Sequence, residues 1–383
     1  MERQNGSIII NLETYSPKSN WTKFKRNKLS LAGLSFITFI SFCSVLGYLI
    51  TPDESPMANA MNLPLSIEKP GKTITILNIP KNPKPQSVNF FEKMLFGQES
   101  QFDKIPVISY QFTNFKLFYK EYMGGDEAGE RKELLLQNTF KTTNTITVKD
   151  NFIIQKTYWL GTDIYGRDLL SRIIIGSRVS LIVGFMAVII SLLLGVSLGA
   201  AAGYYGGKTD AFISWLMNVV WSLPALLLVI AISFALGKGF WQVFIAVGLS
   251  MWVEVARLVR GQVLEMKNAQ FIEAAKSLGF SNGRIIYGHI LPNILGPILV
   301  VASSNFASAI LLEAGLSFLG FGAQPPMPTW GGMIKEHYGY IIIDAAYLAL
   351  IPGLMIMLMV YSFNLITIGL RDLFDVKSQN TNV

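Results

Sequence analysis

The stretch AAGYYGGKTD, residues 201–210, holds residue types that could bind the phosphates of a nucleotide. In a phosphate-binding loop, a glycine is followed by four residues, a second glycine, a lysine and then Ser or Thr. The backbone N–H groups and the lysine of such a loop surround the phosphates. Gly207, Lys208 and Thr209 match the end of this pattern, but Ala202 stands where its first glycine belongs. Whether the stretch binds ATP therefore depends on the elements around it.

Apolar runs before and after this stretch determine the fold class. Only 15% of all residues are charged, whereas soluble globular proteins have about 25%. A helix of about 20 apolar residues is long enough to cross a bilayer. Glu254 is the only charged residue in six such runs, which are Leu29–Ile50, Val179–Gly203, Phe212–Leu236, Phe240–Ala256, Ile294–Leu312 and Ala345–Gly369. The sequence therefore predicts an all-α polytopic membrane protein with six transmembrane helices.

This setting argues against an ATP site at residues 201–210. A phosphate-binding loop follows a strand, whereas these residues follow the second apolar run and lead into the third. Gly195, Gly199 and Gly203 are four residues apart, so they share one helix face that suits close packing against another helix. The pair at 206–207 is then expected to form the short turn of a membrane hairpin.

Basic residues predict the orientation of the chain. Loops on the cytoplasmic side of a membrane carry an excess of Lys and Arg. Three segments of this chain do so, through Lys18, Lys23, Lys25, Arg26, Lys28, Arg257, Arg260, Lys267, Lys276, Arg284, Arg371 and Lys377. Six spans place all three segments on one side, which predicts that both termini are cytoplasmic. The net charge of +7 then follows from topology, and no nucleic-acid partner is expected.

The predicted domains follow from these spans. They are a cytoplasmic tail at 1–28, a transmembrane helix at 29–50, an extracytoplasmic insertion at 51–158, a transmembrane core at 159–377 with a cytoplasmic loop at 257–292, and a tail at 378–383. The first run is too long and too far from the start for a cleavable signal peptide. Alternating or β-rich stretches at 73–79, 104–119 and 143–158 predict strands in the insertion, with loops at 81–85 and 123–133. The alternative is a partly ordered loop.

A loop rich in proline and glycine, GLSFLGFGAQPPMPTWGG at 315–332, separates the fifth and sixth runs. Prolines interrupt regular helix here, and irregular backbone at membrane depth must be buried in protein or line a cavity. The loop is therefore a candidate pathway or gate element, and an ordinary surface loop is the alternative. Its candidate residues are Ser317, Phe318, Gly320, Gly322, Pro325, Pro326 and Trp330.

The segment NAQFIEAAKSLGFSNGRIIYGHILPN, residues 268–293, is too apolar to be simply solvated. Its apolar residues recur at helical spacing and predict one stripe, made of Phe271, Ile272, Ala275 and Leu278. Gly279 suits the end of this helix, and Ser281 can cap a second short helix. Such a segment docks a partner protein or, alternatively, rests on lipid headgroups.

The remaining charged and reactive residues favour simple explanations. Glu254 is expected to pair with Arg257 one turn away. Three arginines before the second run are expected to extend to the headgroups, with contact to a binding protein as the alternative. They are Arg167, Arg172 and Arg178. His289 and His337 fall on opposite sides of the membrane, so together they form no metal site. Cys43 is the only cysteine, so the chain has no internal disulfide, and no grouping of residues indicates a catalytic centre.

Residues 268–293 also resemble a known family. Glu273-Ala274-Ala275, three further residues, Gly279 and then Leu291-Pro292 are similar to the EAA loop of permease subunits in bacterial ATP-binding-cassette importers. Residues 159–181, 313–331 and 352–375 resemble the C-type permeases of oligopeptide, dipeptide and nickel importers. His289-Ile290 stands where the general EAA pattern has Ile before Leu-Pro, and this form is similar to the same group of importers. The chain departs from that group at two places, which are Thr367-Ile368 where Gly-Asp is usual and the long insertion at 52–158.

The resemblance implies a transport subunit rather than an enzyme. A homologous partner permease would complete the path, and a substrate-binding protein would dock outside. Two cytoplasmic ATPase subunits would hydrolyse the ATP, so this chain needs no cofactor. The ATPase-coupling residues would be Glu273, Ala274, Ala275, Gly279, Leu291 and Pro292. The implied location is the bacterial cytoplasmic (inner) membrane.

The implied substrate is a di- or oligopeptide, and three alternatives stay open. The first is nickel or another small solute in the same importer family. The second is a stand-alone secondary transporter, which would have polar or ionisable residues within several spans, or inverted repeats. The third is a sensor or assembly scaffold built on the insertion.

Overall fold

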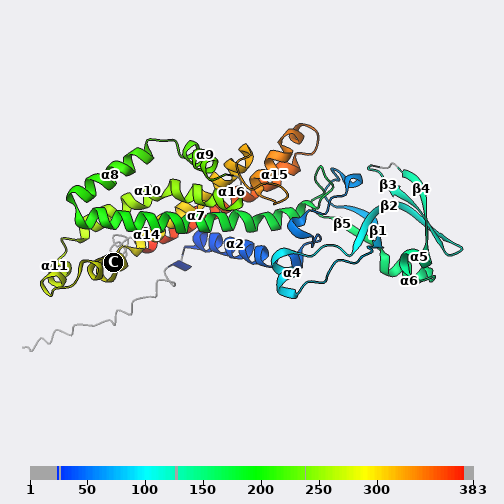
Figure 1. The fold of residues 1–383 in the computed structure, drawn as a ribbon, viewed down its shortest axis with the longest axis horizontal. Coiled ribbons are helices and arrows are strands. Elements are labelled where there is room, and N and C mark those ends of the chain that lie inside the picture. Colours follow the sequence, from blue (N-terminus) through cyan, green and yellow to red (C-terminus); the bar gives the residue numbers. More distant parts are fainter. Residues whose placement is uncertain (1–23, 26, 126–127, 238, 375–383) are drawn as a thin grey trace, which may run out of the picture.

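The computed structural model describes residues 24–25, 27–125, 128–237 and 239–374 of the chain. The predicted tail at 378–383 and most of the tail at 1–28 lie outside the described residues. The molecule is elongated, with long helices side by side along its length and a β-sheet beyond one end of them (Figure 1). We call this the sheet end, and we call the opposite end, where helix α11 lies, the α11 end.

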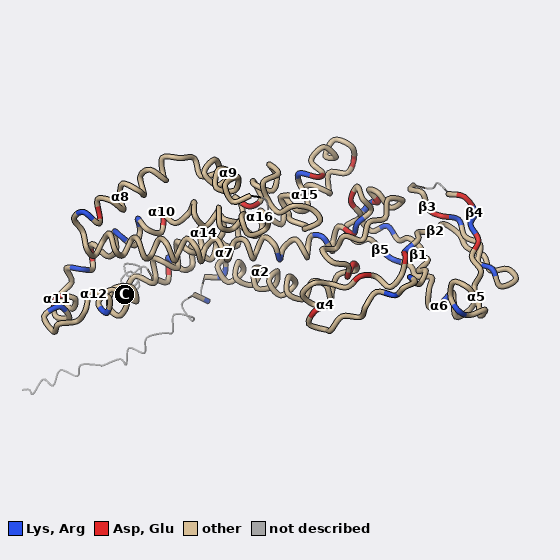
Figure 2. The backbone as a smooth tube through the Cα atoms, in the orientation of Figure 1, with Lys and Arg blue, Asp and Glu red and all other residues tan. Residues whose placement is uncertain are grey.

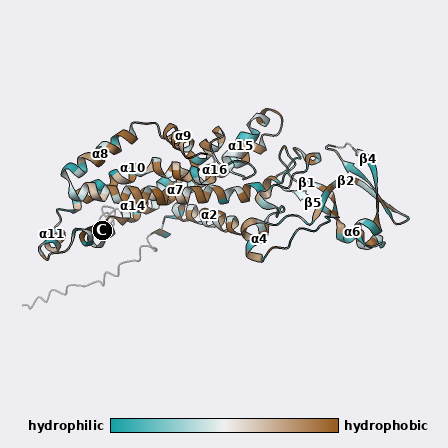
Figure 3. Ribbon diagram, viewed as in Figure 1, coloured by the Kyte–Doolittle hydropathy of each residue, from teal (hydrophilic) through white to brown (hydrophobic). Residues whose placement is uncertain are grey.

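Five helices are long and apolar enough to cross a membrane, namely α2 (Lys28–Val45), α7 (Leu169–Tyr205), α10 (Phe240–Met266), α14 (Leu295–Leu319) and α16 (Tyr347–Phe374). Apolar residues predominate along these helices (Figure 3). Charged residues lie mainly at the two ends of the bundle and in the sheet (Figure 2). This distribution confirms a helical polytopic membrane protein.

The third predicted span is not one continuous helix. Its residues form α8 (Gly207–Trp221) and α9 (Ala225–Leu236), which are bent by 96° at the break between them. The break ends at Pro224, which lacks a backbone N–H and disfavours helical geometry at Leu223. The chain therefore has five candidate spans, or six if this bent pair counts as one.

Helix α7 is longer than the predicted second span and packs tightly on α10. It begins ten residues earlier than Val179, where the side chain of Asp168 accepts a hydrogen bond from the Ser171 N–H. A Cβ atom added at Gly195 would lie 2.7 Å from the Trp252 carbonyl oxygen. The equivalent atom at Gly203 would lie 2.8 Å from the Arg260 carbonyl oxygen. The predicted packing role of the glycine face is therefore confirmed.

The other side of α7 meets a second layer of helices. There α16 packs between α14 and α2, and Phe306 stacks on Phe363 with ring centres 4.1 Å apart. The short helix α15 (Trp330–His337) closes this layer at the sheet end. Its Trp330 is fully buried, and the indole N–H donates to the Ile173 carbonyl at 3.0 Å. These contacts attach the loop before α15 to the frame made by α7.

The insertion forms a five-stranded antiparallel sheet in the order β4-β3-β2-β1-β5. Three short helices accompany it, α4 (Phe90–Phe96), α5 (Leu136–Phe140) and α6 (Thr145–Phe152). Its buried core includes Leu77, Leu117 and Val148. The strands are β1 (Lys72–Pro80), β2 (Phe102–Thr113), β3 (Lys116–Tyr122), β4 (Ala128–Leu135) and β5 (Ile153–Tyr158). The β-containing insertion is therefore confirmed.

Two local predictions in the insertion are wrong. Residues 145–152 are helical rather than extended, because the Asn144 side chain accepts hydrogen bonds from the N–H groups of the first turn and caps a helix there. Residues 128–133 are not a loop, because they belong to the edge strand β4. Lys132 pairs with Glu121 of β3 at 2.8 Å across this edge. Charged side chains are suited to an exposed edge strand, so a high charge does not exclude one.

Candidate functional site

The segment with the EAA pattern folds into two short helices at the α11 end (Figure 1). Helix α11 spans Gln270–Ser277 and α12 spans Asn282–Ile285, followed by the π-helix η3 (Ile286–Ile290) and α13 (Leu291–Asn293). The predicted pair of helices is therefore confirmed.

A Schellman motif closes α11. Gly279 adopts a positive φ of 77°, the Phe280 N–H donates to the Ala275 carbonyl at 3.1 Å, and the Gly279 N–H donates to the Lys276 carbonyl at 2.9 Å. The predicted left-handed helix stop is thus present. Ser281 does occupy the cap position of α12, but its side chain makes no capping hydrogen bond. That part of the prediction is wrong.

The predicted apolar stripe of α11 is only half buried. Ile272 and Ala275 are buried in a cluster with Val259 and Val263 of α10, which attaches α11 to the bundle. Phe271 and Leu278, in contrast, remain 46% and 74% exposed. The stripe is thus divided between two residues that pack on the bundle and two that stay exposed.

The opposite side of the segment is an exposed surface that mixes an acid with apolar side chains. Glu273 and Ala274 are both exposed on α11. Tyr287 of η3 adds a ring that is 71% exposed. We call this surface, made of Phe271, Glu273, Ala274, Leu278 and Tyr287, the α11 face. It has the mixture of charge and apolar area that a protein partner or a lipid surface could contact.

Polar and aromatic contacts hold the α11 face in place. The Tyr204 hydroxyl, near the end of α7, donates to the Asn282 side chain at 2.9 Å. His289, at the position where the general EAA pattern has Ile, stacks on Phe280 with ring centres 5.7 Å apart. The Asn293 amide then donates to the His289 carbonyl at 2.6 Å.

Leu291 and Pro292 lie at the join to α14. Leu291 is half-buried and Pro292 is exposed. Because proline has no N–H to donate, it cannot close a regular helical turn. The π-turn that precedes it is an irregularity common at such points. None of these placements tests the coupling roles, which stay predictions.

A buried ion network lies at the sheet end of α7. The Arg167 guanidinium pairs with Asp163 at 2.6 Å and with Glu336 of α15 at 2.9 Å. Arg172 approaches the same two acids at 3.5 and 3.6 Å. Both arginines are about 2% exposed. The prediction that they extend to lipid headgroups is wrong, because the buried Asp163 and the partly exposed Glu336 neutralise them from two separate segments.

Arg178 is held by backbone carbonyl groups rather than by headgroups. Its guanidinium donates to Ser44 and Val45 at the end of α2 and to Met94 and Leu95 at the end of α4. Carbonyl groups at a helix C-terminus carry partial negative charge. Arg178 therefore joins two helix ends to α7, and the lipid prediction is wrong for this residue too.

His337 lies beside the ion network. With Asp163 and Glu336 it places ligand atoms within 4.8 Å of one another. Both acids already pair with arginines, whose positive charge opposes a metal ion at the same oxygens. Burial lowers the pKa of His337, and its ring nitrogen Nδ1 lies 2.7 Å from the Met333 carbonyl. The cluster therefore fits an ion-pair network better than a metal site.

Glu313 is a fully buried acid that the sequence reasoning missed. It lies inside α14 and is 1% exposed. Ser317 donates to one of its carboxyl oxygens at 2.7 Å, and Ser180 of α7 contacts the other at 3.2 Å. An acid inside a span marks a functional candidate by default, and a serine four residues later was the local signal. The predicted fifth run ends at Leu312, so Glu313 falls just outside it.

The candidate pathway residues divide into three groups. Gly322 and Trp330 are buried in packing, and a Cβ at Gly322 would collide with Ser317. Phe318 and Pro326 are exposed. The third group borders a cavity of about 180 Å³ together with Arg172 and Glu336 of the ion network, and its members are Ser317, Gly320 and Pro325. The structure thus brings only part of the predicted set together, and a gating role stays a prediction.

The predicted ion pair between Glu254 and Arg257 is wrong. Glu254 is exposed, and within the described residues it forms no ion pair or hydrogen bond. Arg257 instead lies 4.0 Å from the centre of the Trp221 ring and donates to Asn218 at 2.8 Å. Contacts between α10 and α8 therefore replace the expected contact along α10.

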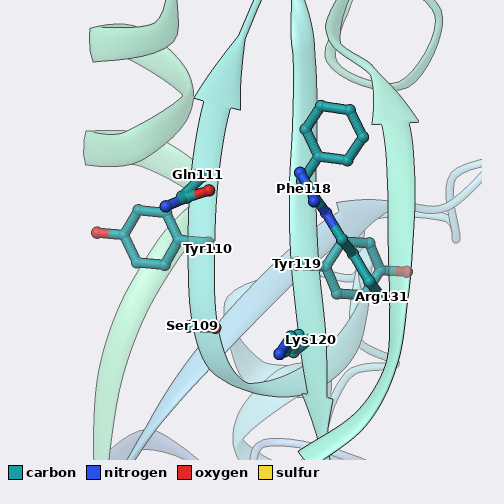
Figure 4. A pocket seen from close by; sticks show the side chains of 7 residues that line it. All are labelled: Ser109, Tyr110, Gln111, Phe118, Tyr119, Lys120 and Arg131. Carbon is teal, nitrogen blue, oxygen red and sulfur yellow. The ribbon is translucent and has the colours of Figure 1, made fainter.

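A separate hollow lies on the sheet of the insertion. It measures about 280 Å³ and is lined by residues of β2, β3 and β4, and Figure 4 shows them. Arg131 lies 4.2 Å from the centre of the Phe118 ring, and Tyr110 lies opposite Tyr119 in the strand register. The hollow is open and belongs to the part of the chain for which the sequence analysis found no family counterpart.

Two family models match the chain. Residues 195–379 match "Binding-protein-dependent transport system inner membrane component", and residues 18–64 match "N-terminal TM domain of oligopeptide transport permease C". Both matches exclude most of the insertion.

Curated relatives match a little more than half of the chain. The chain is 46% identical over 223 residues to a dipeptide transport system permease protein of Alkalihalophilus pseudofirmus, which covers 58% of this chain and 73% of the relative. It is 42% identical over 220 residues to a glutathione transport system permease protein of Pectobacterium atrosepticum, covering 57% and 73%. For an oligopeptide transport system permease protein of Bacillus subtilis the identity is 37% over 222 residues, covering 58% and 72%.

These relatives are transport subunits rather than enzymes, and in such systems separate subunits hydrolyse ATP. The glycines at 206 and 207 fit this result, because they join α7 to α8 after a helix and not after a strand. The chain belongs to the family of binding-protein-dependent transport system inner membrane components, within its branch of C-type permease subunits.

Proposed function

We propose that this permease forms one half of the path of an ATP-driven importer for di- or oligopeptides. A homologous partner permease supplies the other half, two ATPase subunits bind at the α11 end, and a substrate-binding protein docks at the sheet end. The printed names of its relatives, which concern dipeptides, oligopeptides and glutathione, support the peptide class.

The α11 face is the observation that carries this proposal. It offers the exposed Glu273 carboxylate, together with the exposed side chains of Phe271 and Leu278, on a helix whose other side is anchored on α10. A partner that grips this face can pull on α7 and α10, because Tyr204 and Ile272 link it to both helices. Such a connection is what coupling of ATP hydrolysis to the path requires.

The proposed orientation puts the α11 end and both termini in the cytoplasm and the insertion outside. The concentration of Lys and Arg near the α11 end supports it, because positive charge favours the cytoplasmic side. The loop that borders the cavity beside Arg172 lies at the sheet end. In this orientation it is a gate element on the outer side of the path.

Replacing Glu273 by Ala in the full importer tests the coupling role. The side chain is exposed, so the change should alter stability by less than about 0.5 kcal/mol. Loss of a charge that is buried and hydrogen-bonded in a complex costs about 2–5 kcal/mol of association. Co-purification of the ATPase and substrate-stimulated ATP turnover should therefore fall sharply. Glu265→Ala is the matched control, because Glu265 is an exposed acid in the last turn of α10, at the α11 end but outside the α11 face.

Gly279→Ala adds an independent test of the same segment. A non-glycine residue in the left-handed conformation is strained by about 1–2 kcal/mol, which would shift α12 relative to α11. Gly283→Ala is its control, since Gly283 has open space around it and no positive φ. Full transport with both Glu273→Ala and Gly279→Ala would mean that the α11 face only rests on lipid, which contradicts the proposal.

The substrate class has its own experiment. The reconstituted importer, with its cognate binding protein, is offered labelled dipeptides, longer peptides and a nickel chelate in parallel. ATP-dependent uptake of peptide supports the proposal. Uptake of the nickel chelate alone would assign this permease to the nickel branch instead.

A further inference from the structure

The short helix α4 (Phe90–Phe96) exposes an unusual amount of apolar surface for a segment outside the spans. Its side chains at Phe90, Phe91, Leu95 and Phe96 are 62%, 71%, 50% and 68% exposed. At about 100° per residue, Phe90, Phe91 and Leu95 fall within one side of the helix. Clustered apolar surface of this kind marks a contact with another protein or with a membrane.

The depth of α4 is fixed by its contacts with α7. The Arg178 guanidinium donates to the Met94 carbonyl at 3.1 Å and to the Leu95 carbonyl at 2.6 Å. Arg178 immediately precedes Val179, where the apolar run of α7 begins. Helix α4 therefore lies at the level where α7 passes from polar to apolar surroundings.

The surface beside α4 belongs to a membrane span. The same guanidinium donates to the Ser44 and Val45 carbonyls, so α4 and the end of α2 meet at one side chain. Helix α2 faces outward with Phe39, Phe42 and Val45 at 61%, 64% and 53% exposed. Figure 1 shows α4 next to this end of α2. The apolar side chains of α4 thus continue a lipid-facing surface.

The other side of α4 is fixed to the protein. Lys93 pairs with Glu54 at 2.6 Å, and Gly97 packs so tightly that a Cβ there would lie 2.6 Å from the Glu54 carbonyl oxygen and 2.9 Å from the Tyr48 ring. These contacts use the polar side of α4, whereas Phe90 and Phe91 on its other side contact each other edge to face and remain largely exposed.

We propose that α4 is an interfacial anchor that lies in the headgroup–acyl boundary of the leaflet at the sheet end. Its aromatic rings suit that boundary, because large amphipathic and aromatic side chains concentrate there. The anchor holds the start of the β-sheet insertion against the membrane, so that the sheet does not swing freely above the bundle. This inference depends on the spans but not on the choice of substrate or ATPase.

Collisional accessibility of spin labels tests the anchor in the full importer, reconstituted in vesicles of phosphatidylethanolamine and phosphatidylglycerol. A Cys43→Ala background leaves no other cysteine. Labels are placed at Phe91→Cys, at Val45→Cys as a lipid reference and at Lys120→Cys, an exposed site of β3, as a water reference. Molecular oxygen reports lipid exposure, and a water-soluble nickel complex reports water exposure.

The expected result is that the label at 91 collides more with oxygen than with the nickel complex, as at 45 and unlike at 120. A preference for nickel at 91 would overturn the proposal, because α4 would then lie in water. Low collision rates with both reagents would also overturn it, because a protein partner would then cover the helix. Leu95→Cys, on the same side of α4 as Phe91, repeats the measurement if the Phe91 variant fails to assemble.

Discussion

Gly199 of α7 and Ala256 of α10 are in backbone contact, such that a Cβ atom added at Gly199 would lie 2.5 Å from the Ala256 carbonyl oxygen. Backbone on both sides leaves no flexible side chain that can move away. Gly199 is the middle one of the three glycines on this face of α7, so the close approach of α7 and α10 depends on this contact.

Gly199→Ala should therefore destabilise the protein, because the helices must separate. Overpacking of this kind costs about 1–3 kcal/mol, and the thermal unfolding temperature of the purified protein in detergent measures it. Gly261→Ala on α10 is the control, because Gly261 has nothing within 4 Å, and the change should be neutral or stabilising by about 0.5–1 kcal/mol. Equal unfolding temperatures for the two variants would show that α7 and α10 are not closely packed.

Asp163→Ala should destabilise the sheet end of α7 strongly. It removes the nearest acid from two buried arginines, Arg167 and Arg172. Removal of one partner of a buried ion pair lowers the free energy of unfolding by about 3–5 kcal/mol. Glu133→Ala, which breaks a surface pair with Lys116, should cost only about 0–1 kcal/mol. The same unfolding measurement compares the two, and a small effect at 163 would mean that water already reaches the network.

Glu313→Ala should loosen the loop between α14 and α15, because Ser317 and Ser180 both lose a hydrogen-bond partner. A buried polar group left without a partner costs about 1–3 kcal/mol. Glu313→Gln keeps an acceptor of similar size and should restore most of the stability. Limited proteolysis of the loop at 320–329, together with the unfolding temperature, reports both variants. If Glu313→Gln and Glu313→Ala lower stability equally, the charge of the carboxylate, and not its hydrogen bonds, stabilises the loop.

Single cysteines at Lys120 and Lys276 test the proposed orientation in a Cys43→Ala background. Both positions are exposed, one on β3 and one on α11. A membrane-impermeant maleimide added to intact cells should label position 120 and not 276. Permeabilised cells are the control and should label both. Labelling of 276 alone in intact cells would reverse the topology.

Local patterns in the sequence predicted the parts of the fold that depend on neighbouring residues. The spacing of Gly195, Gly199 and Gly203 identified a packing face, and Gly279 identified a helix end, because one helix periodicity or one backbone angle determines each of them. The bend before α9 also had a local signal in Pro224, but the uninterrupted hydrophobicity of residues 212–236 concealed it.

Contacts between distant segments could not be predicted in the same way. Asp163 and Glu336 are separated by most of the core, and nothing near either residue indicates that both reach the same arginines. Without those partners, Arg167 and Arg172 look like ordinary cations before a span. The exposure of Phe271 and Leu278 likewise depends on where α10 lies, which helical periodicity does not contain.

Helix α7 runs without interruption through 37 residues, which is about 55 Å at 1.5 Å per residue. Arg172 is fixed near its first turn, and Tyr204 is fixed at its last turn. A small rotation about one end of a helix this long displaces its other end by several ångströms. If its α11 end were the pivot, a tilt of about 5° would move its other end by about 5 Å. A tilt of a few degrees at the α11 end would thus suffice to displace the arginines beside the cavity.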